Sequence, residues 1–256
     1  MSQKTRADGS ARERLQAQRE KEKARARRGR QAKVAGAVVL VLAVAAGIAV
    51  WASSTGDGKS APVAAPKGAT GGDKPMVSVG KKDAPSTLDV WEDFRCPACK
   101  QFETGFRKTV HELQDSGQLK TNYHLALLID GNMGGKGSLN AGNAALCAQN
   151  AGKFRDYHDV LYTNQPAEQQ DRYADKTYLI KLAGKVPGLV TRDFRSCVHD
   201  GTYNGFVQKS QEAFQSGGFQ GTPSIFLNGK NLFADQSARM TPQKLQQMVQ
   251  DANKKK

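Results

Sequence analysis

Two cysteines separated by two residues, Cys96 and Cys99, are the residues of this sequence whose types and spacing most clearly indicate chemistry. Pro97 and Ala98 stand between them. A thiolate is the nucleophile of disulfide exchange. Two thiols one helical turn apart lie close enough to close a small disulfide ring. The spacing therefore predicts a redox-active cysteine pair.

The residues around this pair predict a strand followed by a helix. An alternating apolar run from Leu88 to Phe94 is typical of a strand. Cys96 then falls at a helix N-cap and Pro97 at the first helical position, where the missing N–H has no cost. The free amides and the positive end of the helix dipole would stabilise a Cys96 thiolate. Four apolar residues continue at helical spacing: Phe102, Phe106, Val110 and Leu113.

A zinc site is the alternative interpretation of the same spacing. Such a site normally needs four ligands. The other two cysteines, Cys147 and Cys197, stand alone, and the sequence contains no second C-x-x-C and no H-x-x-x-H. Redox chemistry is therefore favoured over metal binding.

A second motif lies near the end of the chain. Residues 221–230 (GTPSIFLNGK) predict a turn with a proline, a buried strand and an Asn-Gly hairpin turn. Taken alone, Thr222-Pro223 would be an ordinary turn before a strand. Together with F-x-C-P-x-C at 94–99, however, this motif resembles the DsbA-like branch of the thioredoxin superfamily, from roughly Met76 to the C-terminus.

The resemblance implies roles for residues of the second motif. In that family its proline is cis and packs beside the C-x-x-C, and the backbone just before it pairs with the substrate chain. Those roles would fall here on Pro223 and Thr222.

Two positions depart from the family pattern. The family often carries a buried acid six residues before the first cysteine, which assists proton transfer at the second; here that position is Val90. Strand alternation puts Glu92 on the same face, so we expect Glu92 to take over this role, the alternative being a solvated edge carboxylate. Strongly oxidising members have His between the cysteines, where this chain has Ala98. With only the helix terminus and Arg95 as positive influences, a less oxidising site is expected.

The first 52 residues predict a membrane anchor. Residues 1–33 contain twelve Lys/Arg and four Asp/Glu, so they carry +8 of the net charge of +14. A nucleic-acid-binding arm is one interpretation, but residues 34–52 (VAGAVVLVLAVAAGIAVWA) have no charge and are long enough to span a bilayer. The positive-inside rule keeps residues 1–33 in the cytoplasm and sends the rest outside. A cleaved signal peptide is the alternative.

The remaining chain divides into a tether and a folded domain. Residues 53–74 are rich in Gly, Ser, Ala and Pro and predict a flexible linker. The domain is expected over residues 75–256, with Leu119 to Ile129 as a central strand. About residues 137–217 are mostly helical by pattern, and the resemblance implies a helical domain inserted at this point.

Cys147 and Cys197 both fall on helices predicted within this insertion. Outside the membrane, thiols tend to oxidise. Four cysteines, taken as one catalytic and one structural pair, leave none over. We expect a Cys147–Cys197 disulfide, the alternative being two buried free thiols.

The fold expected is α/β, a thioredoxin-like fold with an inserted helical domain, preceded by one N-terminal transmembrane helix. The resemblance implies a membrane-anchored extracytoplasmic thiol:disulfide oxidoreductase. It would oxidise exported client proteins through Cys96–Cys99 and be recharged by a redox partner in the membrane. No organic cofactor, metal or nucleic acid is expected. A reductase of the same fold and a non-enzymatic binding module with this fold are the alternatives.

Overall fold

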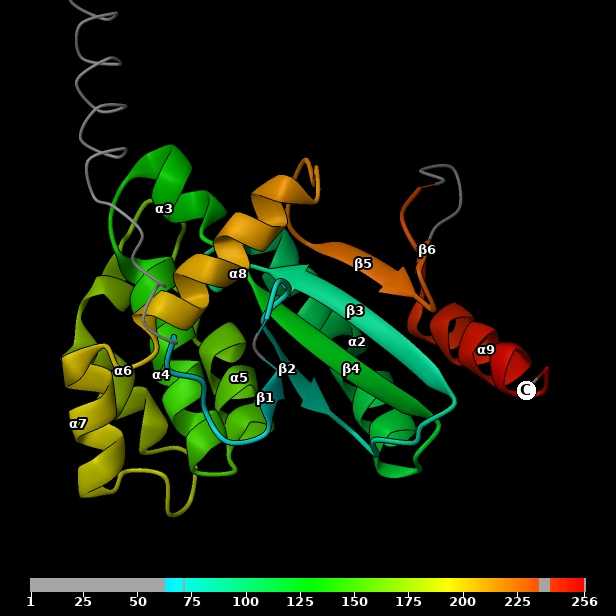
Figure 1. Ribbon diagram of the computed structural model, residues 1–256, viewed down its shortest axis with the longest axis horizontal. Helices are drawn as coiled ribbons and strands as arrows, with labels where there is room; N and C mark the ends of the chain where they lie inside the picture. The colour runs from blue at the N-terminus through cyan, green and yellow to red at the C-terminus, as the bar shows by residue number, and fades with distance from the viewer. Residues whose placement is uncertain (1–62, 71, 235–239, 256) are drawn as a thin grey trace, which may run out of the picture. The chain divides into compact units, whose positions relative to one another are not determined.

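A mixed β-sheet organises residues 63–70, 72–234 and 240–255, which are the part of the chain that this computed structural model describes (Figure 1). Its six strands lie in the order β1 (Ala69–Thr70), β2 (Met76–Val79), β4 (Leu119–Leu125), β3 (Ser86–Glu92), β5 (Ser224–Leu227) and β6 (Lys230–Asn231). β3 and β4 run parallel, and the other neighbouring pairs are antiparallel.

The helix α2 (Pro97–Asp115) connects the two parallel strands. Parallel strands need such a crossover, and the helix packs its apolar stripe onto the sheet. Phe102, Val110 and Leu113 are buried, while Phe106 is partly buried against the same core. The predicted strand and helix around the cysteines are therefore present, with β3 placed two residues earlier than expected.

Between β4 and β5 the chain is helical, as the pattern predicted. In Figure 1 the helices α4 to α7 gather at one side of the sheet, and α9 (Pro242–Asn253) lies at the opposite end. The predicted stripe Phe154, Tyr157, His158 and Leu161 is fully buried on α5. The helical elements between the two strands are α3 (Leu128–Met133), α4 (Gly137–Asn150), α5 (Phe154–Thr163), η1 (Arg172–Ala174), α6 (Lys176–Ala183), α7 (Arg192–Asp200) and α8 (Asn204–Ser216).

The strand predicted from Leu119 to Ile129 is too long at its C-terminal end. β4 ends at Leu125 because its parallel partner β3 ends at Glu92, which pairs with Leu125. Beyond that point the Ile129 amide donates to the Asp93 carboxylate at 2.9 Å. That amide is satisfied by a side chain instead of a ladder, and α3 begins.

The predicted linker over residues 53–74 is also corrected in part. Ala69 and Thr70 pair with Val77 and Met76, so β1 extends the sheet upstream of residue 75. The Gln149 side chain of α4 donates to the Lys67 carbonyl at 2.8 Å. The open edge of β2 explains the pairing, because its unpaired backbone groups accept another strand.

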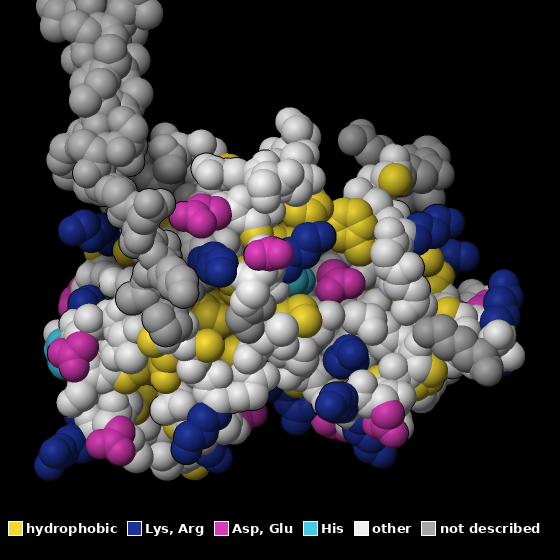
Figure 2. Space-filling model, in the orientation of Figure 1, with side chains coloured by type: hydrophobic (Ala, Val, Ile, Leu, Met, Phe, Trp, Pro, Cys, Tyr) yellow, Lys and Arg dark blue, Asp and Glu magenta, His cyan; other side chains and the backbone are white. Residues whose placement is uncertain are grey.

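The predicted anchor over residues 34–52 and the basic segment 1–33 lie outside the described residues. Within the described ranges, no helix combines the length and the apolar character needed to cross a membrane. On the face in Figure 2, acidic and basic side chains are interspersed, with apolar side chains between them.

A disulfide joins Cys147 on α4 to Cys197 on α7, with Cα atoms 5.9 Å apart. The sulfur of Cys147 comes from a helix that is buried along most of its length, mainly through small residues. The bond therefore ties two helices of the insertion to each other.

Replacing Cys147 and Cys197 together by serine should lower the free energy of unfolding by up to about 4 kcal/mol, because the disulfide closes a long loop in the unfolded chain. Urea denaturation of the double variant and the parent measures this difference. Peptide mass analysis of the non-reduced parent is the matching control, and two free thiols at these positions would contradict the disulfide.

Candidate active site

Cys96 occupies the N-cap of α2, and Pro97 is the first helical residue, as predicted. The Cys96 backbone is extended, with φ −73° and ψ 120°, so the chain turns from β3 into the helix at this residue. Pro97 and Ala98 are exposed, while Cys96 is 6% exposed and Cys99 is fully buried. The helix thus presents one sulfur near the surface and withdraws the other into the core.

The second motif lies directly against the first. The Thr222–Pro223 peptide bond is cis. The Cys96 thiol donates to the Thr222 carbonyl at a Sγ–O distance of 3.2 Å. These residues are separated by 126 positions in the chain, and the antiparallel pairing of β3 with β5 brings them together. Asn228 and Gly229, both with positive φ, form the predicted turn after β5.

The two thiols have opposite acidities. A hydrogen bond from the Cys99 thiol, helped by the amides of Ala98 and Cys99, lowers the pKa of Cys96 to about 6 despite its burial. Burial raises the pKa of Cys99 well above 9, and the Cys96 sulfur and the charge of Glu92 add to this. Both thiols are free in this structure. Cys96 is therefore the more acidic of the two thiols, and Cys99 is the less acidic and more deeply buried one.

The buried Asp93 side chain stabilises the turn before the cysteines through hydrogen bonds. Its carboxylate accepts hydrogen bonds from the Arg95 amide at 2.8 Å, the Ser138 hydroxyl at 2.7 Å and the Ile129 amide at 2.9 Å. Burial nevertheless raises the pKa of Asp93 to about 7. The side chain thus connects β3 to α3 and α4 directly below the cysteine turn.

The sequence suggested Arg95 as a positive charge beside the thiolate. In the structure its charge is paired with carboxylates. It is 5% exposed, and its guanidinium lies 2.6 Å from Asp130 and 3.2 Å from Asp171. It also donates to the carbonyls of Gly134 and Glu168. Two carboxylates neutralise its charge, so its effect is to hold the loop.

Gln165, which follows α5, supports the cysteine turn from the other side. Its side-chain amide donates to the carbonyls of Phe94 and Cys96, both at 2.9 Å. Sequence reasoning missed Gln165 because a polar residue after a helix carries no signal of its distant partners. Asp93 and Ser138 were also missed, because their hydrogen-bond partners are distant in the sequence as well.

Glu92 is buried, so the alternative of a solvated edge carboxylate is wrong. Its Oε1 lies 2.8 Å from Nε2 of His158, which is also buried. Glu103 lies within reach of both and is buried as well. Burial raises the pKa of Glu103 well above 4.5, and the charge of Glu92 adds to this.

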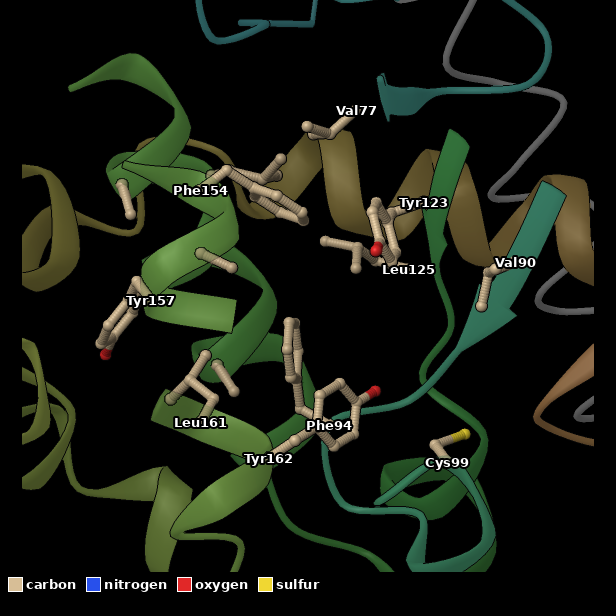
Figure 3. Close-up of a cluster of buried hydrophobic side chains, with 14 of the residues drawn as sticks. Val77, Val90, Phe94, Cys99, Tyr123, Leu125, Phe154, Tyr157, Leu161 and Tyr162 are labelled. Carbon is tan, nitrogen blue, oxygen red and sulfur yellow. The ribbon is translucent and has the colours of Figure 1, made fainter. Parts of the chain in front are cut away.

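Aromatic rings enclose this Glu92–Glu103–His158 cluster. His158 contacts the rings of Phe94, Tyr123, Phe154 and Tyr162. Figure 3 shows Cys99 at one end of the same buried region, beside Phe94 and Tyr162. A signal was available in the sequence, because a Glu and a His both stand on otherwise apolar helical stripes.

Two carboxylates and an imidazole are also metal ligands, and their ligating atoms lie within 4.8 Å of one another. The His158 nitrogen that an ion would need is already in contact with Glu92. A carboxylate, an imidazolium and a protonated carboxyl group balance their charges to neutrality. The charges of this cluster can therefore balance through protons alone.

An apolar hollow of about 340 Å³ borders the cysteine pair. Ala98, Pro223 and Phe233 lie in its wall, so it joins the first motif to the second. A wider hollow on the other side of Pro223 includes Thr222 and Phe226. An extended chain reaching Cys96 would lie along these two hollows.

Comparisons with known proteins agree with this site. A family model described as thioredoxin matches residues 73–251. Disulfide bond formation protein D of Bacillus subtilis is 28% identical over 162 residues, which cover 61% of this chain and 70% of that protein.

Solved structures show the same similarity. The reduced disulfide bond oxidoreductase DsbG from Mycobacterium tuberculosis superposes with a TM-score of 0.59 at 26% identity, covering 69% of this chain and 86% of that chain. Oxidised BdbD from Bacillus subtilis gives a TM-score of 0.58 at 25% identity, covering 73% and 98%.

The alkylation rate of Cys96 by iodoacetamide should rise with pH and reach half its maximum near pH 6, because the thiolate is the reactive form and its pKa is lowered to about 6. Cys99 should stay unreactive over this range. Peptide mass analysis of protein quenched at each pH measures both sites. The Cys96→Ser variant is the control, and a midpoint near 8.5, as for a free cysteine, would contradict the lowered pKa.

Proposed function

Because the chain belongs to the thioredoxin family, as a DsbA-like thiol–disulfide oxidoreductase, we propose that Cys96 and Cys99 are its redox pair and that it oxidises exported proteins. The observation that supports this most directly is the opposite acidity of the two thiols. Such a pair has one good nucleophile and leaving group at the surface and one protected sulfur behind it.

The oxidative reaction proceeds in two exchanges. A client thiolate attacks Sγ of Cys96 in the Cys96–Cys99 disulfide, and the electron pair of the broken bond leaves on Sγ of Cys99. A second client thiolate then attacks the client sulfur of the mixed disulfide and releases Cys96 as a thiolate. Its pKa of about 6 makes Cys96 a good leaving group. The client gains a disulfide and the enzyme is left as a dithiol.

Thr222 and Pro223 position the client in this proposal. The Thr222 carbonyl lies 3.2 Å from the Cys96 sulfur, so a chain bonded to Cys96 passes directly over it. Pro223 is a proline and has no amide hydrogen that could compete for the client backbone. Apolar client side chains fit the hollow beside Phe233.

Disulfide reduction in the same compartment is the second candidate, and one observation favours it. Cys96, at about 6, is closer in pKa to the cysteine of thioredoxin, about 7, than to that of DsbA, about 3.5. Ala98 offers no cation to lower it further. In that direction Cys96 attacks a client disulfide and Cys99 resolves the mixed disulfide.

The remaining parts of the proposal concern location. Residues 34–52 form a single span, residues 1–33 stay in the cytoplasm, and the domain, predicted to begin near residue 75, lies outside. Disulfide bond formation protein D of Bacillus subtilis is named for a process that takes place in oxidising compartments. A redox partner in the membrane reoxidises the cysteine pair, within reach of the tether.

The redox potential of Cys96–Cys99 in the purified full-length protein separates the two directions. Equilibration with glutathione should give about −120 to −180 mV for a disulfide donor. A value near −270 mV, as in thioredoxin, would favour the reductase. Cys96→Ser and Cys99→Ser should each abolish client oxidation, and a variant that keeps it would contradict the assignment of the redox pair.

The anchor should keep the chain in the membrane pellet during alkaline extraction. Protease added to the outside should remove the domain and spare residues 1–33. Leu42→Arg is the matched variant, because a charge at mid-span costs about 3 kcal/mol on insertion scales and should release the chain. N-terminal sequencing decides the cleavage alternative, since a mature protein that begins after Ala52 has no anchor.

A further inference from the structure

A row of ionisable side chains leads from the buried thiol Cys99 to the surface between α2 and α5. We propose that His158, Asp159 and His111 relay protons between solvent and the buried Glu92–Glu103 pair, so that Cys99 exchanges its proton through the helical insertion and not through the client-binding face. This inference rests on the proposed redox function of Cys96–Cys99.

The inner end of the row lies at Cys99. Glu103 follows Cys99 by four residues on α2, so the two side chains are neighbours on one helix face. Glu92 approaches from β3 closely enough for its charge to raise the pKa of Cys99. Burial and the charge of Glu92 raise the pKa of Glu103 well above 4.5 and so favour its protonated form. One oxygen of each carboxyl group has no hydrogen-bond partner among the described residues.

His158 forms the middle of the row, and both its ring nitrogens face carboxylates. Nε2 lies 2.8 Å from Oε1 of Glu92, and Nδ1 lies 3.7 Å from Oδ1 of Asp159. Burial alone would lower the pKa of His158, but the charge of Glu92 raises it to about 10. Aromatic rings surround this imidazole, so the two carboxylates are its nearest partners for proton exchange.

The outer end of the row reaches solvent. Oδ2 of Asp159 lies 3.5 Å from Nε2 of His111. Side-chain exposure rises along the row, from 2% at His158 to 20% at Asp159 and 26% at His111. Burial lowers the pKa of His111, and Arg155 and Arg107 add to this. His111 is therefore neutral near pH 7 and able to accept a proton from solvent.

The ionisable residues of α2 along this row are regularly spaced in the sequence. Cys99, Glu103, Arg107 and His111 follow one another at intervals of four residues, so each lies one turn beyond the last. Arg107 approaches Asp159 at 3.0 Å and stabilises its charge. The ionisable groups that face the row from the packed elements are Glu92, Glu103, Arg107, Asp115, Tyr123, Arg155 and Tyr162.

The proton matters because of how Cys99 leaves. When a client thiolate bonds to Sγ of Cys96, the S–S bond breaks and its electron pair moves to Sγ of Cys99. A sulfur whose pKa is well above 9 is a poor leaving group as a thiolate. The Glu103 carboxyl group protonates it, and solvent restores that proton through the row. Reoxidation sends the proton outward by the same groups.

The test compares three variants of the full-length protein, His158→Gln, His111→Ala and His124→Gln. His124 is the matched control, because it is a buried histidine that lies 3.6 Å from a carboxylate, on Asp89, but is stacked on Trp91. Glutathione reduces the oxidised protein at each pH from 5 to 8.5, and acid quenching with thiol labelling gives the rate. Thermal unfolding of each variant measures its stability.

His158→Gln should slow reduction at pH 7 by about a hundredfold or more, within the range of lost acid–base catalysis. His111→Ala should slow it less, and added imidazole should restore the rate because that site is open to solvent. A purely structural role would change stability without this rescue. His124→Gln should keep the parent pH profile.

Parent-like pH profiles in both His158→Gln and His111→Ala would overturn the relay, as would a stoichiometric metal bound in the purified parent. If His158→Gln fails to fold, the test of the relay is whether added imidazole restores the reduction rate of His111→Ala, where the side chain is half-buried. A parent that shows no Cys96–Cys99 exchange would instead overturn the proposed function, so the two failures are distinguishable.

Discussion

The site depends on the opposite environments of two sulfurs, Cys96 and Cys99, that lie one helical turn apart. The Cys99 thiol and, to a lesser extent, the amides at the start of α2 favour negative charge on Cys96, and the apolar core disfavours it on Cys99. Disulfide exchange needs this asymmetry, because a client must meet one sulfur and not the other. The parallel pair β3 and β4 is connected by the crossover helix α2, which begins with Cys96 at its N-cap and places Cys99 within the core.

The helical insertion is part of the site and not a cover over it. Arg95 pairs with Asp130 and Asp171, and Gln165 donates to the backbone on both sides of Arg95. Removing one partner of a buried ion pair typically costs about 3–5 kcal/mol, because it leaves an unpaired charge. The cysteine turn is therefore fixed to helices that are far away in the chain, which keeps the Cys96 sulfur at one position beside Thr222.

Local periodicity predicted those parts of the fold in which burial repeats along the chain. The stripes of α2 and α5, the Pro97 start of α2 and the Asn228-Gly229 turn all depend on neighbours in sequence. The end of β4 and the pairing of β1 depend on where another strand stops or leaves an edge open. Arg95 was misjudged in the same way, because its partner Asp130 lies 35 residues away, and the His158 partner of Glu92, 66 residues away, could not be predicted either. Ionisable residues on apolar stripes, Glu103 on α2 and His158 on α5, were the local signs of this cluster.

In the proposed relay, the insertion takes part in the chemistry because the buried acid stands at position 92 and not at position 90. Two residues along a strand move a side chain by about 6.6 Å while keeping it on the same face. Val90 of β3 pairs with Tyr123 of β4. Glu92 belongs to the last pair between these two strands, and its partner there is Leu125. A carboxylate at position 92 lies at the end of the paired strands and contacts His158 on α5. An isolated carboxylate in such a core would be neutralised by its burial, so the imidazole from the insertion is what allows a charge to persist beside Cys99.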